Sequence, residues 1–217
     1  FIVERFSEGS EIIAAGIVFR GTYHLASISD KTLSPAPYFV DIMHASPSRF
    51  EHLRDRITAL GQRIAEEFEI AVSPLIMEIM VADDGELSLI EAVPEFGGEF
   101  IPDLLIPEST GYGFIRETIK AATNTGFTPP SPRTKKAVVV RYITGTPGRL
   151  VSFNGKPRRM NGLVSWKMFK QEGSEIRGVT ATNHDRIGVV ITRGRSHRAA
   201  IDAAERAVAE LKITIEG

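Results

Sequence analysis

The chain has 217 residues and a formal net charge of −1, which is enough length for one large domain or two small ones. The near-neutral charge gives no support for nucleic-acid binding. No apolar run approaches the roughly 20 residues of a membrane span, and no signal peptide is visible. The chain has no cysteine, which excludes disulfides and thiolate metal sites, and we expect a cytoplasmic protein.

The first part of the chain predicts strands followed by one amphipathic helix. Residues 1–6 and 11–28 are predicted strands, and 38–43 is a shorter one. A helix is predicted to begin at 47–48, because apolar residues then recur at spacings of three and four. These residues are Phe50, Leu53, Ile57, Leu60, Ile64 and Phe68.

The segment IMEIMVADDGELSLIEAVPEFGGEF, residues 76–100, contains two apolar runs joined by Asp84 and Gly85. This dipeptide is a strong hairpin signal, because a two-residue turn needs positive φ. A symmetric turn centred on the two residues makes Glu78 and Glu91 direct cross-strand neighbours, with Cβ atoms about 5 Å apart. The sequence therefore predicts two carboxylates side by side.

Such a pair is costly without a compensating charge. At an effective dielectric of about 20, the two charges repel by roughly 3 kcal/mol, and both faces of the hairpin are predicted to be buried, since Ile79 would oppose Ile90. One carboxylate keeps its proton, an Arg or Lys lies between them, or a divalent cation bridges them. Mg²⁺ prefers one or two carboxylates plus phosphate oxygens, so the third solution also predicts a phosphate-bearing substrate. The alternative to such a site is a hairpin without a function, whose two acids merely point to solvent.

The remaining elements are predicted from periodicity and from a proline-rich break. A helix is predicted at 113–122, then strands near 137–144, 149–153 and 187–193, and a helix at 196–211 with Ser196 as its N-cap. Three prolines interrupt the chain after Asn124. The predicted organisation is a first domain at 1–123, a linker at 124–136 and a C-terminal α+β subdomain at 137–217.

With the hairpin in place, the chain resembles the second half of an ATP-grasp domain. In that family, two acidic residues on adjacent strands hold Mg²⁺ or Mn²⁺ against the phosphates of ATP, and the second acid lies in a pattern close to Glu-x-Asn-x-Arg-x-Gly-Gly. Here IEAVPEFGG supplies Glu91, Gly97 and Gly98. The resemblance implies an α+β fold, with an antiparallel sheet core and flanking helices, whose N-terminal part is missing. It assigns Glu78 and Glu91 as metal ligands.

The start of the chain, FIVERFSEGSEI, resembles the hinge strand of this family, typically Val-Glu-x-φ-φ-x-Gly-x-Glu, where φ is apolar. The resemblance implies that the main chain of Glu4, Arg5 and Phe6 hydrogen-bonds adenine and that Glu11 accepts from the ribose hydroxyls. The chain begins with Phe1 rather than Met, and the family's other phosphate-binding Lys and its glycine-rich lid precede the hinge strand. We therefore expect a fragment that lacks the N-terminal part of its own protein and does not catalyse alone.

The stretch ISDKTLSPAPYFVDIMHASPS resembles the L-amino acid ligase branch and the related carbamoyl-phosphate-synthase-like ATP-grasp proteins. In those proteins a Lys follows a strand, and an acid-x-x-His motif follows the prolines. The resemblance implies that Lys31 lies near phosphate and that Asp41 and His44 line the substrate side. Strand alternation would send Asp41 and His44 to opposite faces unless a bend intervenes.

Two residues depart from the family pattern. Val93 stands where the family has a metal-binding Asn, and Glu95 stands where it has an Arg. Water can replace the missing ligand on Mg²⁺. Glu95 is expected to meet a cationic substrate group such as an amine, or to become a further metal ligand, and loss of catalysis is the third interpretation.

The resemblance implies an ATP- and Mg²⁺-dependent carboxylate–amine ligase that forms an acyl phosphate and joins an amino acid or related carboxylate to an amine. Its expected partners are these small molecules, with a homodimer allowed and neither nucleic acid nor membrane. Two alternatives stay open: a non-catalytic ATP-grasp-like module that binds a nucleotide or a protein, and a carbamoyl-phosphate-forming or biotin-carboxylase-like enzyme that uses bicarbonate.

Overall fold

The computed structural model describes residues 1, 3, 7–131, 136–155, 157, 160–178 and 181–217. The chain divides into two compact units, Phe1–Asp30 with Ser46–Lys135 and Lys31–Ala45 with Lys136–Gly217. Residues 31–45, within the predicted first domain, thus group with the second unit, and the predicted domain division stays a prediction. No helix in the described ranges is long and apolar enough to cross a membrane.

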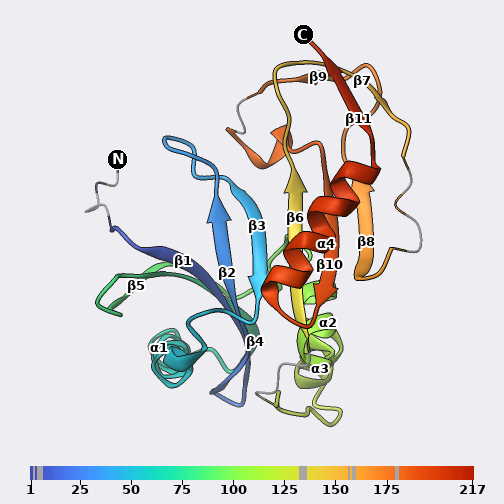
Figure 1. Ribbon diagram of the computed structural model, residues 1–217. Helices are drawn as coiled ribbons and strands as arrows, with labels where there is room; N and C mark the ends of the chain where they lie inside the picture. The colour runs from blue at the N-terminus through green and yellow to red at the C-terminus, as the bar shows by residue number, and fades with distance from the viewer. Residues whose placement is uncertain (2, 4–6, 132–135, 156, 158–159, 179–180) are drawn as a thin grey trace. The chain divides into compact units, whose positions relative to one another are not determined.

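The first unit is built on antiparallel strands in the order β5-β4-β1-β2, with one long helix, α1, against one face (Figure 1). The elements are β1 (Ser10–Phe19), β2 (Thr22–Leu33), α1 (Arg54–Glu67), β4 (Val72–Val81) and β5 (Leu87–Val93). An antiparallel sheet with flanking helices is the fold class that the sequence predicted.

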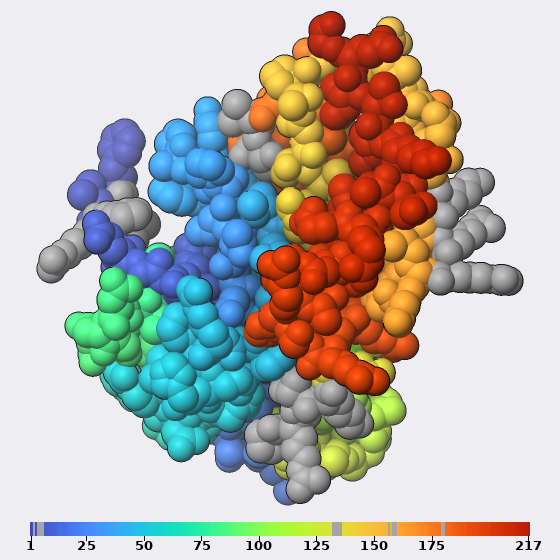
Figure 2. Space-filling model, in the orientation of Figure 1, coloured from blue at the N-terminus to red at the C-terminus, as the bar shows by residue number. Residues whose placement is uncertain are grey.

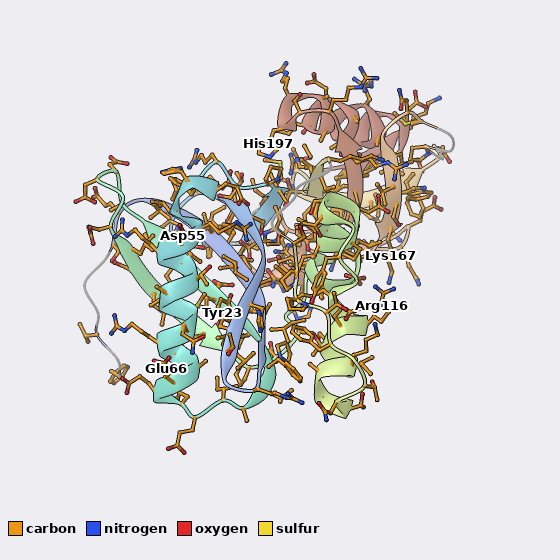
Figure 3. All side chains as sticks on the ribbon, turned by 90° about the horizontal axis from the view of Figure 1, so that it is seen from below. Tyr23, Asp55, Glu66, Arg116, Lys167 and His197 are labelled. Carbon is orange, nitrogen blue, oxygen red and sulfur yellow. The ribbon has the colours of Figure 1, made fainter. Side chains whose placement is uncertain are left out.

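The face of this sheet toward α1 forms the core of the first unit. Alternate residues of β1, β2 and β4 pack there against Ile57 and Ile64 of α1. The Tyr23 ring lies between the strands and the helix (Figure 3). A Cβ added at Gly16 of β1 or Gly61 of α1 would approach this ring to 2.3 Å. Both positions therefore require glycine, because the ring fills the space where a side chain would begin.

The sequence prediction of one strand over residues 11–28 is wrong. A hairpin turn at Arg20 and Gly21, with φ of 52° and 76°, separates β1 from β2. Apolar residues continue on both sides of this turn, and they concealed it. The predicted strand at 38–43 begins later, as β3 (Asp41–Ser46), and the regular part of α1 follows a 3₁₀ turn at Glu51–Leu53.

Three short helices complete the first unit: η2, a π-helix at Ile101–Leu105, α2 (Ile106–Thr110) and α3 (Phe114–Thr123). The structure confirms the helix predicted at 113–122. The segment after it, around Phe127, packs against this unit, because the Phe127 ring centroid lies 4.8 Å from that of Phe19 and 5.2 Å from that of His24. The first part of the predicted linker is thus packed against β1 and β2.

Glu117 fastens this segment to α3. Its side chain is only 3% exposed. Burial alone would raise the pKa of the Glu117 carboxyl, but hydrogen bonds from Lys120 Nζ, the Thr128 N–H and Arg116 Nε outweigh burial and hold the pKa below its ordinary value. The carboxylate form therefore stabilises the folded unit.

The second unit contains the strand order β3-β6-β10-β8 and a separate three-stranded sheet, β11-β7-β9. Its elements are β3, β6 (Ala137–Ile143), β7 (Gly148–Phe153), β8 (Leu163–Met168), β9 (Glu175–Ile176), β10 (Gly188–Gly194), α4 (His197–Glu210) and β11 (Ile213–Glu216). The predictions near 137–144, 149–153, 187–193 and 196–211 are confirmed, whereas β8, β9 and β11 were not predicted.

The helix α4 packs on the second unit through small residues, and its other side lies at the surface (Figure 2). Ala200, Ala203, Ala204 and Ala207 are buried. The Ser196 Oγ accepts a hydrogen bond from the Ala199 N–H at 3.3 Å, so Ser196 is the N-cap that the sequence predicted.

Candidate functional site

Glu78 of β4 and Glu91 of β5 are directly paired across the hairpin, as predicted. Directly opposed residues of an antiparallel pair point to the same face, so the two carboxylates are neighbours. Glu78 is half-buried, and Glu91 is exposed. The pairing is the central feature of the candidate site.

The route to this pairing differs from the predicted symmetric turn. Ala82 donates its N–H to the Glu86 carbonyl at 2.9 Å, which leaves a three-residue loop at 83–85 with Gly85 at φ 83°. This is the three-residue hairpin, with glycine in the left-handed region. Near the loop the register is therefore displaced by one residue from the symmetric two-residue turn.

A β-bulge between Glu78 and Ile79 restores the register. Ile79 pairs with Leu89 on one side of the bulge, and Glu78 pairs with Glu91 on the other. The predicted contact between Ile79 and Ile90 is therefore wrong. Without the extra residue in β5, Glu78 would face Ile90, and the carboxylates would not be paired, because a one-residue slip exchanges the two faces.

The prediction that both faces of the hairpin are buried is also wrong. Among the described strands, β5 lies at the edge of the sheet and pairs with β4 alone, and Leu89 and Ile90 are 43% and 48% exposed. Water therefore reaches the Glu91 side of the pair and screens part of the repulsion between the carboxylates.

Glu11 lies on the same sheet face as the glutamate pair. Ile13 of β1 pairs with Glu78, and Glu11, two residues before Ile13, pairs with Met80. Because side chains alternate along a strand, residues 11, 13, 78, 80 and 91 share the face opposite α1. This face thus carries three carboxylates, from Glu11, Glu78 and Glu91, together with the apolar Ile13 and Met80.

The paired carboxylates fit a divalent cation. They are hard oxygen donors on adjacent strands, which is the donor set that Mg²⁺ takes when it also binds phosphate oxygens. A bound cation would also remove the repulsion between two like charges about 5 Å apart. The residues present in the structure are therefore suited to Mg²⁺ or Mn²⁺.

The segment after β5 has an unusual backbone. Glu95 is exposed, Gly97 has φ of 69°, and the non-glycine residues Glu99 and Phe100 both have φ of 62°. Left-handed non-glycine residues cost about 1–3 kcal/mol each and are concentrated at functional sites. The strand pair ends where the Ser73 Oγ donates to the Pro94 carbonyl at 3.1 Å.

In the second unit, Lys31, Asp41 and His44 lie close together. Lys31 Nζ is 3.2 Å from Asp41 Oδ1, and the two side chains are 5% and 16% exposed. Asp41 and His44 have ligand atoms within 4.8 Å of one another, and His44 is fully buried. Regular strand alternation would separate Asp41 from His44, but Asp41 is the first residue of β3, where alternation does not yet fix the direction of its side chain.

The sequence analysis did not predict two groups near His44, an aromatic ring and a guanidinium. The Tyr142 ring of β6 lies edge-on to His44, with centroids 6.1 Å apart, and the Arg186 guanidinium stacks on Tyr142 at 3.7 Å. Tyr142 is 1% and Arg186 4% exposed. The available signal was an arginine directly before the apolar run of β10.

Comparison with known families now adds to this geometry. Residues 1–103 match the model of the ATP-grasp domain, and residues 141–216 match the model of L-amino acid ligase C-terminal domain 2. The first part of the chain is thus similar to the ATP-grasp domain, and its last part is similar to an L-amino acid ligase domain. A comparison with curated protein sequences gives no match.

Solved ATP-grasp structures are similar to the chain over almost its whole length. An L-amino acid ligase from Bacillus licheniformis has a TM-score of 0.79 at 19% identity, with 98% of this chain and 55% of that chain covered. Phosphoribosylglycinamide synthetase from Anaerococcus prevotii has a TM-score of 0.79 at 18% identity, with 97% and 55% covered. A biotin carboxylase from Campylobacter jejuni, in complex with β,γ-ATP, has a TM-score of 0.69 at 17% identity, with 99% and 48% covered.

These likenesses show the ATP-grasp fold, and the chain spans about half the length of the structures it matches. The predicted adenine-binding residues Glu4, Arg5 and Phe6 lie outside the described residues. The predicted ribose-binding Glu11 lies near the start of β1, on the glutamate face. The roles assigned to all these residues in the ATP-grasp site stay predictions.

Proposed function

We propose that the full-length protein is an ATP- and Mg²⁺-dependent carboxylate–amine ligase. A substrate carboxylate attacks the γ-phosphate of ATP and gives an acyl phosphate and ADP. The amine of an amino acid or related compound then attacks the acyl carbon, and phosphate leaves.

The observation that carries the proposal is the pairing of Glu78 with Glu91. Two adjacent carboxylates are stable beside a phosphate chain only with cations between them. The match of residues 141–216 to an L-amino acid ligase domain favours an amine over bicarbonate as the second substrate. The match of residues 1–103 to the ATP-grasp domain favours ATP as the phosphate donor.

In this proposal Glu78 and Glu91 hold the metal ion, which when bound neutralises charge between the carboxylate substrate and the triphosphate. Glu11 accepts hydrogen bonds from the ribose hydroxyls. The main chain of 4–6 would bind adenine, as the resemblance implies.

On the substrate side, we assign Lys31, Asp41 and His44 to one group. Asp41 already matches the charge of Lys31 at 3.2 Å, so Lys31 would act on phosphate as part of an ion pair rather than as an isolated cation. Glu95 is exposed and offers a negative charge that would attract the incoming amine.

The test is an ATP-dependent ligation assay on the full-length protein. We expect ADP release that requires both an amino acid and Mg²⁺, and a peptide or amide product detected by mass spectrometry. Glu78→Gln and Glu91→Gln should abolish this release, whereas Glu67→Gln, on the exposed face of α1, should not. The isolated 217 residues should give no product.

Two results would favour the alternatives. ADP release that requires bicarbonate and needs no amino acid would indicate a carboxylase, or, with ammonia as the nitrogen donor, a carbamoyl-phosphate-forming enzyme. Nucleotide binding without turnover under any substrate would indicate a non-catalytic module.

A further inference from the structure

A cavity of about 450 Å³ lies within the second unit, and neither Glu78 nor Glu91 lines it. Its walls come from the loop between β2 and β3, from Ile42 of β3, and from Thr144 and Gly145 after β6, with a further contribution from Gly178. This volume falls within the range of roughly 300–1,000 Å³ that small-molecule sites occupy.

The chemistry of the walls is apolar. Pro35, Ala36, Tyr38 and Ile42 line the cavity, and among the described residues its lining contains no charged side chain. Burying a charged group against such walls would cost several kcal/mol. Among the described lining residues, the polar side-chain groups are the uncharged hydroxyls of Ser34, Tyr38 and Thr144. The cavity therefore suits an uncharged group that is aliphatic or aromatic.

The loop that forms one wall is held in place by its own hydrogen bonds. The Ser34 N–H donates to the Val40 carbonyl at 2.7 Å, and the Val40 N–H donates to Ser34 Oγ at 2.9 Å. The ion pair between Lys31 and Asp41 joins the two strands at the base of the same loop. A preformed wall lowers the entropy cost of binding a ligand.

Two further lining residues, Gly145 and Gly178, have crowded surroundings. A Cβ on Gly145 would lie 2.6 Å from the side chains of Ile187 and Ile215, and one on Gly178 would lie 2.1 Å from Pro147. No side chain can therefore begin at either position without displacing its neighbours, and these two positions contribute main chain alone to the cavity.

The cavity is linked in sequence to the predicted substrate-side residues. Ile42 directly follows Asp41, and the wall loop connects Lys31 to Asp41. Thr144, Gly145 and Gly178 lie within the segment that matches the L-amino acid ligase domain. We propose that this cavity binds the uncharged, apolar side chain of an amino-acid substrate. This inference rests on the proposed ligase function, and it names the class of amino acid.

The test fills the cavity. In the full-length protein, Ala36→Trp places a large side chain on the wall, and Ala209→Trp places the same side chain on the exposed side of α4 as a matched control. Ligation is measured with L-alanine, L-leucine and L-phenylalanine at saturating MgATP, and MgATP affinity is measured by calorimetry.

We expect Ala36→Trp to lower kcat/KM for L-leucine and L-phenylalanine about tenfold or more relative to L-alanine, because the larger substrate side chains need the space that the tryptophan occupies. MgATP affinity should not change, and Ala209→Trp should behave as the wild type. Equal changes for all three amino acids, or no change, would overturn the proposal.

A direct binding arm separates this inference from the ligase proposal. Saturation-transfer NMR on the full-length protein would use L-leucine, L-phenylalanine and L-glutamate as probes. Side-chain signals for the two apolar amino acids, lost in Ala36→Trp and kept in Ala209→Trp, support the cavity even if no ligation occurs. Signals for L-glutamate as strong as those for the two apolar amino acids would count against the proposal. The absence of signals for all three probes would also count against it, because it would mean that another part of the protein covers the cavity.

Discussion

Replacing Glu91 with Gln should have opposite effects on stability with and without ligand. In the metal-free protein, the substitution removes a like charge about 5 Å from Glu78, where the unscreened repulsion is roughly 3 kcal/mol at an effective dielectric of about 20. Glu91 is exposed on the edge strand, and surface charge pairs contribute about 0.2–1 kcal/mol. We therefore expect Glu91→Gln to raise the free energy of unfolding by about 0.5–1 kcal/mol, and so to raise Tm.

With MgATP present, the sign should reverse. A ligand at 100 times its Kd stabilises the native state by about 2.7 kcal/mol, and the variant loses one of the two carboxylates that would hold the metal. The assay is thermal unfolding of the full-length protein in EDTA and in MgATP, with Glu67→Gln as a charge-matched control on α1. A variant that is destabilised in EDTA, or that keeps the full MgATP shift, would refute the reasoning.

Three further predictions concern the fold. Gly61→Ala should lower the free energy of unfolding by about 1–3 kcal/mol in urea titrations, because its Cβ would meet the Tyr23 ring, whereas Gly98→Ala, with open space around it, should cost less than 1 kcal/mol. The lowered pKa of Glu117 stabilises the protein above the ordinary carboxyl pKa, and this stability is lost as pH falls through the folded-state pKa. Glu117→Gln should therefore flatten the decline in stability between about pH 5 and pH 2, and an unchanged pH profile would contradict this. Ser196→Ala should cost about 1 kcal/mol through the lost N-cap of α4, measured by chemical denaturation; a loss below about 0.3 kcal/mol would contradict the cap.

Local patterns predicted the helices well. The spacing of apolar residues located α1, α3 and α4, because a 3.6-residue period is a property of neighbouring residues alone. The turns were predicted less completely than the helices. Asp84-Gly85 located the hairpin, but nothing in the local sequence distinguished a two-residue turn from the observed three-residue loop, and Arg20-Gly21 was concealed among apolar residues.

The pairing of Glu78 with Glu91 was predicted correctly, but it does not arise from the symmetric two-residue turn on which the prediction relied. The loop at 83–85 displaces the register by one residue, and the bulge beside Glu78 displaces it back. The bulge depends on how the hairpin packs, so the sequence could not specify it. The exposure of β5 depends on its place at the sheet edge, which is set by long-range pairing.

The surroundings of His44 required the folded chain. Tyr142 and Arg186 lie about 100 and 140 positions further along the sequence, and only the pairing of distant strands brings such residues together. The ion pair between Lys31 and Asp41 likewise depends on the closed loop between β2 and β3. Motif resemblance predicted Lys31, Asp41 and His44 as substrate-side residues, and the structure supplied their mutual contacts.

The most direct test of the account is anomalous diffraction from crystals of the full-length protein grown with Mn²⁺ and a non-hydrolysable ATP analogue. Because Mn²⁺ replaces Mg²⁺ at oxygen sites, we predict an anomalous peak in contact with carboxylate oxygens of both Glu78 and Glu91, with a phosphate oxygen on the same ion. An occupied nucleotide site whose metal ion contacts neither glutamate, or an arginine side chain between the two carboxylates, would contradict it.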